Sequence, residues 1–221
     1  MEGGGASRAG STSAAAPAVL AGAAARRRPG SRRLGLPALA ALGAVALAAA
    51  AASLAAMPGI GGIFGAMLAT VMLAIAVVDA RRFIIPDELS AAGCALGLVF
   101  TALTAAQDPE AGLLPALAAA LARGLILAGA FYGLRALHLR LRGREGMGLG
   151  DVKLAAVAGI WLSLTTLPIA VEIAALSALT VVLARRLAGA PIRASSRLPF
   201  GLFLAPAIWL GWLLEVTLLG P

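Results

Sequence analysis

Cysteine is nearly absent from this chain, and charged and aromatic residues are scarce. Of 221 residues, one is cysteine, 13% are charged and 5% are aromatic. A single cysteine excludes an intrachain disulfide and a CxxC metal site. So low a charged fraction, beside 61% hydrophobic residues, excludes a soluble domain of ordinary composition. Apolar and polar residues do not alternate with a period of two, which argues against an outer-membrane barrel.

Long apolar runs fill most of the sequence, and most approach the roughly 20 residues that a helix needs to cross a bilayer. The chain is therefore predicted to be an all-α, polytopic membrane helix bundle with about seven spans, or six if the first is discounted. The predicted spans are residues 34–56, 61–80, 88–106, a fourth that ends near Leu137, 151–166, 168–185 and 199–218. The sequence TTLP at 165–168 is the predicted turn between the fifth and sixth spans.

Residues 1–33 form a small-residue, basic tail that is predicted to be disordered and cytoplasmic, whereas residues 34–221 form a membrane-embedded domain. The sequence SRRLGL before the first span resembles a twin-arginine export signal. The apolar run that follows is longer than the roughly 7–15 residues of a signal-peptide core, which favours an uncleaved anchor, although cleavage stays open.

Basic residues occupy alternate connections between the predicted spans. The tail and the clusters at 81–82, 135–144 and 185–197 fall on one side of a seven-span topology, and the loops MPGIGG, QDPEAG and TTLP contain no lysine or arginine. The positive-inside rule then predicts a multi-pass inner-membrane protein with a cytoplasmic N-terminus. The net charge of +8 comes from these clusters, so the lipid bilayer is the expected partner and nucleic acid is not.

Two aspartates are predicted at the cytoplasmic ends of their spans, Asp79 at the end of the second and Asp151 at the start of the fifth. Ionisable residues beside hydrocarbon are costly and are therefore functional candidates. Two carboxyls at close range tend to share a proton, so one can activate a water while the other protonates a peptide carbonyl. This chemistry needs no cofactor and no metal. Glycines at 146, 148 and 150 would let the backbone bend sharply there.

A purely structural reading of these acids stays open. Asp79 could form an interfacial ion pair with Arg81 or Arg82, and Asp151 could cap its helix. Pro86 should end any preceding helix, and Asp87 is predicted to cap the third span rather than to act as a third catalytic acid.

Three motifs in order, VVDARRFIIPDEL, GMGLGDVKL and LPFGLFLAP, resemble those of the type IV prepilin peptidases, which are intramembrane aspartic proteases of the GxGD class. The resemblance covers residues 61–210, approximately. It implies that the catalytic residues are Asp79 and Asp151, and that the site-shaping or substrate-binding residues are Gly148, Gly150, Lys153, Pro199, Phe200 and Gly201. It also implies that residues 34–221 are a membrane-embedded peptidase domain.

The resemblance further implies an intramembrane aspartic endopeptidase that removes the basic leader of prepilin-like membrane proteins at the cytoplasmic face. Bifunctional members carry an insert with paired cysteines after the first span, where this chain has only MPGIGG. The expectation is the short, peptidase-only branch found with Flp-type pili, without methyltransferase activity. Leu202 is a departure, because many members have proline after PFG.

The alternative function is a non-catalytic membrane component of a pilus or secretion system, or a transporter that uses the same acids. No internal repeat favours a transporter. Arg123 is expected to snorkel from the outer part of the fourth span or to pair with Glu172. Lys153 should point away from Asp151 and either steady the loop or reach lipid phosphate. The sequence leaves the oligomeric state open.

Overall fold

The structure is a computed structural model that describes residues 35–108, 110, 112–143, 147–189 and 199–219. The chain divides into two units, residues 1–39 and residues 40–221. Of the first unit, the described residues 35–39 include the first residues of a helix. The tail predicted at 1–33 lies outside the described residues, as does most of the basic cluster at 185–197.

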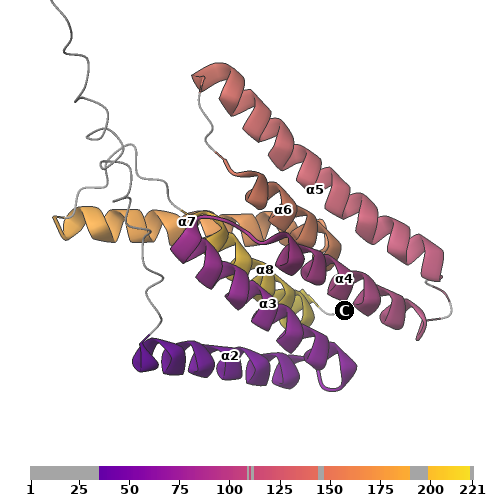
Figure 1. The fold of residues 1–221 in the computed structure, drawn as a ribbon. Helices are drawn as coiled ribbons and strands as arrows, with labels where there is room; N and C mark the ends of the chain where they lie inside the picture. Colours follow the sequence, from indigo (N-terminus) through magenta and orange to yellow (C-terminus); the bar gives the residue numbers. More distant parts are fainter. Residues whose placement is uncertain (1–34, 109, 111, 144–146, 190–198, 220–221) are drawn as a thin grey trace, which may run out of the picture. The chain divides into compact units, whose positions relative to one another are not determined.

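Every regular element in the described part of the chain is helical (Figure 1). The elements are α2 (Leu36–Ala56), α3 (Ile60–Arg82), α4 (Asp87–Ala105), α5 (Leu113–Arg142), α6 (Leu149–Trp161), α7 (Thr166–Leu187), α8 (Gly201–Leu214) and the π-helix η1 (Glu215–Leu219). Six of these segments are long and apolar enough to cross a membrane, and α8 is counted among them together with most of η1. The chain is thus an all-α, polytopic helix bundle, as predicted.

The helix predicted as the fifth span is shorter than expected. It was predicted to end at residue 166, but α6 ends at Trp161 after 13 residues, a length of roughly 20 Å. Pro168 explains the break, because in a continuous helix its ring would clash with the carbonyl of Leu164. It lies instead in the first turn of α7, where proline is tolerated. Among the described residues, six helical segments are therefore long enough to count as spans, because α6, at the fifth predicted span, is too short. The first predicted span is present as α2.

Two local predictions were wrong. The fourth span was expected to end near Leu137, but α5 continues to Arg142, where Gly143 ends it in the left-handed conformation at φ 63°. Leucine and arginine are good helix formers, which explains the extra turn. Asp87 was expected to cap the third span, but Pro86 is the cap residue and the Asp87 side chain pairs with Lys153 instead.

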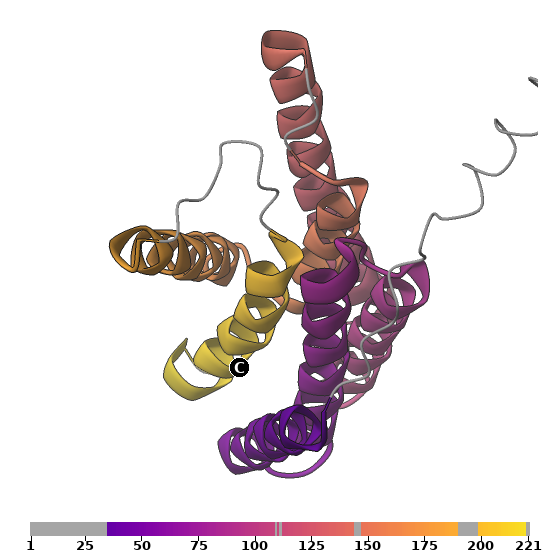
Figure 2. The same ribbon diagram turned by 60° about the vertical axis from the view of Figure 1, so that its left-hand side comes forward.

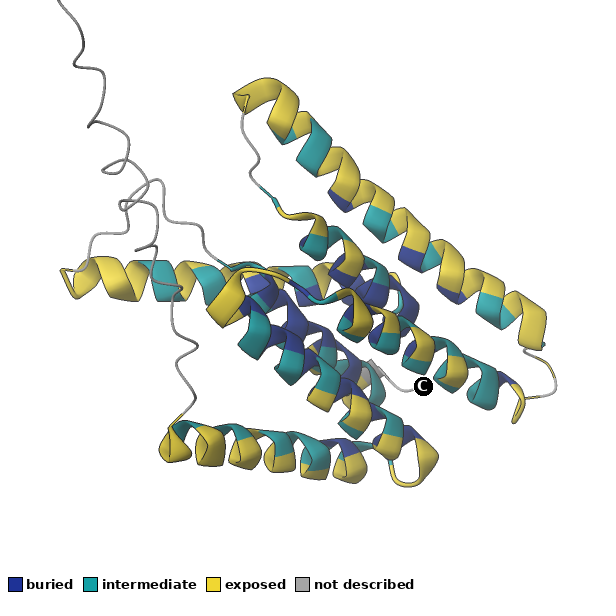
Figure 3. Ribbon diagram, viewed as in Figure 1, coloured by how far each residue is buried: buried dark blue, intermediate teal, exposed yellow. Residues whose placement is uncertain are grey.

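The core of residues 40–221 is centred on α3, α6 and α8. Helix α6 contacts α4, α5 and α8, and α3 contacts α4 and α8. Both ribbon views show α6 alongside α5 (Figure 2), and the buried surface concentrates on the inner helices (Figure 3). The largest fully buried side chains include Leu68, Met72, Ile75, Leu154, Val157, Leu204 and Ile208.

Arg123 has a partner that the sequence did not predict. Its Nε donates to the carbonyl of Gly159 at 3.3 Å, in the last turn of α6, where a helix favours a nearby cation. Glu172, the alternative partner that the sequence left open, is exposed on α7. The contact is close because a Cβ at Gly159 would lie 2.5 Å from the Arg123 carbonyl oxygen. Glycine therefore brings α5 and α6 together at this point.

Candidate active site

Asp79 lies in the last turn of α3 and is buried, with 5% of its surface exposed. Its Oδ2 accepts a hydrogen bond from the backbone N–H of Leu202 at 2.9 Å. Leu202 is the second residue of α8, so its N–H is one of those that the helix itself leaves without a partner. The positive end of a helix stabilises an anion. Helix α8 thus compensates part of the cost of burying this carboxylate.

Asp151 lies in the first turn of α6 and is buried, with 8% exposed. Its Oδ2 accepts a hydrogen bond from the backbone N–H of Gly148, the cap residue, at 3.2 Å. Asp151 therefore does help to cap its helix, as the structural reading proposed, but from the third helical position rather than as the cap residue itself. The contact places a second carboxylate at the positive end of a helix.

Asp79 and Asp151 lie at one site, because Gly201, which is close to Asp79 Oδ2, and Gly150, the residue before Asp151, both lie against Ile85. Each has one oxygen held by a backbone N–H, from Leu202 and from Gly148 respectively. Two carboxyls buried near each other cannot both ionise easily and tend to hold one proton between them. Each carboxylate also lies at a helix N-terminus, which favours a negative charge.

The buried side chain of Ile85 connects the segments that carry the two aspartates. A Cβ at Gly150 would lie 2.9 Å from the Cβ of Ile85. A Cβ at Gly201 would lie 2.7 Å from Ile85 Cδ1 and 2.8 Å from Asp79 Oδ2. Glycine is therefore required at Gly150, where the close atom is the Cβ of Ile85, whereas at Gly201 the close atoms are the ends of two side chains, which would have to shift. Gly148 differs, since its nearest neighbour would be Asp151 Oδ2 at an ordinary 3.6 Å.

This arrangement can be compared with known proteins. Residues 66–183, more than half of the chain, match the type IV leader peptidase family. The chain belongs to this family.

Curated relatives support the assignment to the type IV leader peptidases. The prepilin leader peptidase/N-methyltransferase of Aeromonas salmonicida (strain A449) is 30% identical over 154 residues, which cover 66% of this chain and 47% of the relative. The protein of the same name from Burkholderia pseudomallei (strain 1026b) is 35% identical over 138 residues, 62% of this chain and 42% of the relative. The chain thus spans about half the length of the curated relatives it matches. No solved structure matches it.

The remaining residues expected from the leader peptidase motifs surround the start of α8 and the first turns of α6. Phe200 is the cap residue of α8, and Pro199 precedes it; both are half-buried. Lys153 does not contact Asp151 but pairs with Asp87 at the start of α4. Gly146 lies outside the described residues. Among the described residues, no group of three or more His, Cys, Asp or Glu side chains is placed to hold a metal ion.

Two residues near the site were missed by the sequence analysis. Ile85 lies within the first motif, and its position directly before the proline of a helix break is the one signal in the sequence that marks it. Arg135 lies in α5, where its Nε donates to the carbonyl of Met147 at 3.2 Å. That contact holds the chain just before Gly148. No local pattern in the sequence predicted the contact.

Proposed function

We propose that this member of the type IV leader peptidase family is an intramembrane aspartic endopeptidase that removes the basic leader of prepilin-like proteins. The observation that carries the proposal is the burial of Asp79 and Asp151 in one site, each held by a helix N-terminus. The substrate class follows from the name of the curated relatives, prepilin leader peptidase/N-methyltransferase. Because the chain spans about half of each relative, we assign to it only the peptidase reaction, for which it has the two acids.

The proposed reaction is hydrolysis by a water molecule that Asp79 and Asp151 activate together. One carboxylate removes a proton from the water while the water oxygen bonds to the carbonyl carbon, and the other carboxyl donates its proton to the carbonyl oxygen. Collapse of the tetrahedral intermediate breaks the C–N bond. As that bond breaks, the proton taken from water passes to the leaving amine nitrogen, and the proton on the former carbonyl oxygen returns to the carboxylate that donated it. No cofactor enters this scheme.

The glycines and the start of α8 have shaping roles in this proposal. Gly150 and Gly201 leave room for Ile85, and Gly201 also leaves room for the carboxylate of Asp79. Gly148 supplies the N–H that holds Asp151. Pro199 and Phe200 lead into the first turn of α8, which supplies the N–H that holds Asp79.

We place the site at the cytoplasmic face of the inner membrane, with the N-terminus in the cytoplasm. The support is the distribution of basic residues, because arginines occupy the last turns of α3, α5 and α7. Cytoplasmic ends of membrane helices carry such an excess. Asp79 lies in the same last turn of α3 as Arg81 and Arg82. A leader that stays in the cytoplasm would then meet the aspartates directly.

The test is co-expression with a prepilin-like substrate in cells that lack other leader peptidases, with leader removal followed by gel shift. Asp79→Asn and Asp151→Asn are compared with wild type at matched membrane levels. Asp108→Asn is the control, because Asp108 is an exposed acid beyond the end of α4. We expect cleavage by wild type and by Asp108→Asn only.

Other outcomes would contradict the proposal in distinct ways. Cleavage that survives loss of Asp79 or Asp151 would remove the catalytic pair and favour a non-catalytic membrane component. Absence of cleavage by well-expressed wild type across several prepilin-like substrates would refute the substrate class.

A further inference from the structure

The linker between α3 and α4 joins the helix of Asp79 to the helix that starts beside α6. Phe83 ends α3 in the left-handed conformation at φ 55°, and its N–H bonds back to the carbonyl of Asp79 at 2.9 Å. Ile84 is exposed, Ile85 is buried and Pro86 caps α4. Four residues without regular structure therefore separate Asp79's helix from α4. Side-chain contacts must fix their path.

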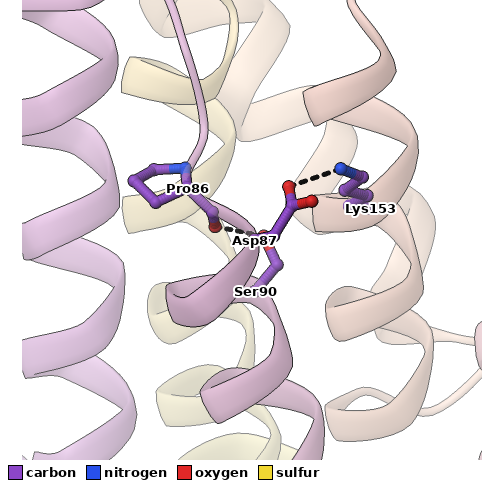
Figure 4. Close-up of polar contacts among 4 residues, drawn as sticks. All are labelled: Pro86, Asp87, Ser90 and Lys153. Carbon is purple, nitrogen blue, oxygen red and sulfur yellow. Dashed lines mark hydrogen bonds and ion pairs between the residues drawn. The ribbon is translucent and has the colours of Figure 1, made fainter.

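Contacts to α6 on both sides of Asp151 hold this linker and Asp87, the first residue of α4. Ile85 packs against Gly150, the residue before Asp151. Asp87 pairs with Lys153, two residues after Asp151 (Figure 4). The Ser90 hydroxyl donates to the carbonyl of Pro86 at 3.3 Å, which ties the linker to the first turn of α4; the bond is drawn as a dashed line in Figure 4.

The ion pair is too exposed to hold the fold together. The Lys153 side chain is 45% exposed and that of Asp87 is 73% exposed, and exposed pairs contribute little to stability. The core of α3, α6 and α8 is apolar and does not depend on the pair. Its consequence is geometric, since it sets how the start of α4 lies along the first turns of α6.

We propose that Asp87 and Lys153 are positioning residues for the aspartate pair. Their ion pair and the Ile85 contact clamp the linker across the first turn of α6, so that Asp79 and Asp151 keep the separation at which they share a proton. The inference rests on the proposed peptidase function, because its first test measures the rate of leader removal. Small displacements of reacting groups reduce rates strongly while leaving the fold intact. The clamp therefore governs turnover more than stability or substrate binding.

The first test measures kcat and KM of leader removal for Asp87→Asn, Lys153→Met, Lys153→Arg and the charge exchange Asp87→Lys/Lys153→Asp. We expect kcat to fall about 10-fold in each variant that breaks the pair, with KM and thermal midpoint nearly unchanged. Lys153→Arg and the charge exchange should recover most of the loss. Glu88→Gln is the matched control, an acid in the same first turn of α4, and should behave as wild type.

These variants separate the clamp from other roles of the same residues. A silent Asp87→Asn beside an inactive Lys153→Met would mean that Lys153 acts on the site alone and would overturn the clamp. A charge exchange no better than the single variants would do the same. A lower kcat in Glu88→Gln would show that any loss of negative charge at the start of α4 slows cleavage of a basic leader. That result would overturn the clamp.

A second readout does not depend on catalysis. Asp79→Cys and Asp151→Cys are combined in a Cys94→Ala background, Cys94 being the single cysteine of the chain, and the rate of disulfide formation between the two introduced cysteines is measured. Adding Lys153→Met should slow that rate about 10-fold, whereas Glu88→Gln should not. An unchanged rate would refute the clamp even if wild type cleaved no prepilin. If wild type cleaves no prepilin but the rate of disulfide formation depends on Lys153, only the proposed peptidase function is refuted.

Discussion

The carboxylate of Asp79 accepts a hydrogen bond from the backbone N–H of Leu202, a residue 123 positions further along the chain. The bond connects the last turn of α3 to the first turn of α8. It explains why the third motif belongs to a site whose acids both lie elsewhere. The motif contributes a helix N-terminus and a glycine that makes room for the carboxylate.

Leu202→Pro should keep most of the cleavage activity, because many members of the family that the motifs resemble have proline at this position. Proline removes the N–H that Leu202 donates to Asp79, but it is tolerated in the first turn of a helix, so α8 should still form and favour the anion. Leu202→Ala keeps the N–H and is the control in the same cleavage assay. A loss of about 10-fold or more in Leu202→Pro alone would contradict this and would show that the site depends on this one hydrogen bond, since a bond to a charged group contributes about 1.5–3 kcal/mol.

Alanine substitutions should distinguish the two glycines of the GxGD motif. In Gly150→Ala the new Cβ would lie 2.9 Å from the Cβ of Ile85, which cannot move without the backbone. Overpacking of this kind costs about 1–3 kcal/mol and would displace the linker, so activity should fall sharply. Gly148→Ala meets only an ordinary contact at 3.6 Å and should stay active. Rates of leader removal at equal protein levels provide the comparison, and the reverse order would contradict the role given to Ile85.

Gly159→Ala should destabilise the protein by separating α5 from α6. The new Cβ would lie 2.5 Å from the backbone oxygen of Arg123 and 2.7 Å from the Cα of Gly124. We expect a loss of about 1–3 kcal/mol or more, seen as a lower thermal midpoint in detergent. Gly129→Ala is the control, because nothing lies within 4 Å of that position. Alanine is the better helix former and should be neutral or stabilising there. Equal midpoints for the two variants would be inconsistent with the packing described.

Arg123→Met should destabilise the carboxyl end of α6. It removes the guanidinium that donates to the carbonyl of Gly159 at 3.3 Å. Cations at a helix C-terminus contribute about 0.3–1 kcal/mol, and up to about 2 kcal/mol when partly buried. Arg123→Lys keeps the charge and should retain part of the effect. Thermal unfolding of the three proteins in one detergent checks this, and indistinguishable Met and Lys variants would rule out a contribution from the charge.

Composition and motif order by themselves determined that this chain is a helical membrane protein and pointed to its family. Apolar runs of bilayer length dictate helices, because a backbone in hydrocarbon must satisfy its own hydrogen bonds. The motifs around Asp79 and Asp151 carried the candidate acids. Even the break before α7 follows from local chemistry, since Pro168 is disfavoured in a helix interior and is tolerated in the first turn of α7.

Tertiary structure alone decided how the acids are held. The donors to Asp79 and Asp151 are backbone N–H groups, which every residue except proline possesses, so residue type cannot reveal them. The close packing of Ile85 against Gly150 and Gly201 depends on three segments of the chain that meet only after the helices pack. Asp87 resembled a helix cap because local pattern favours that role, and only the approach of α6 gave it Lys153 as a partner.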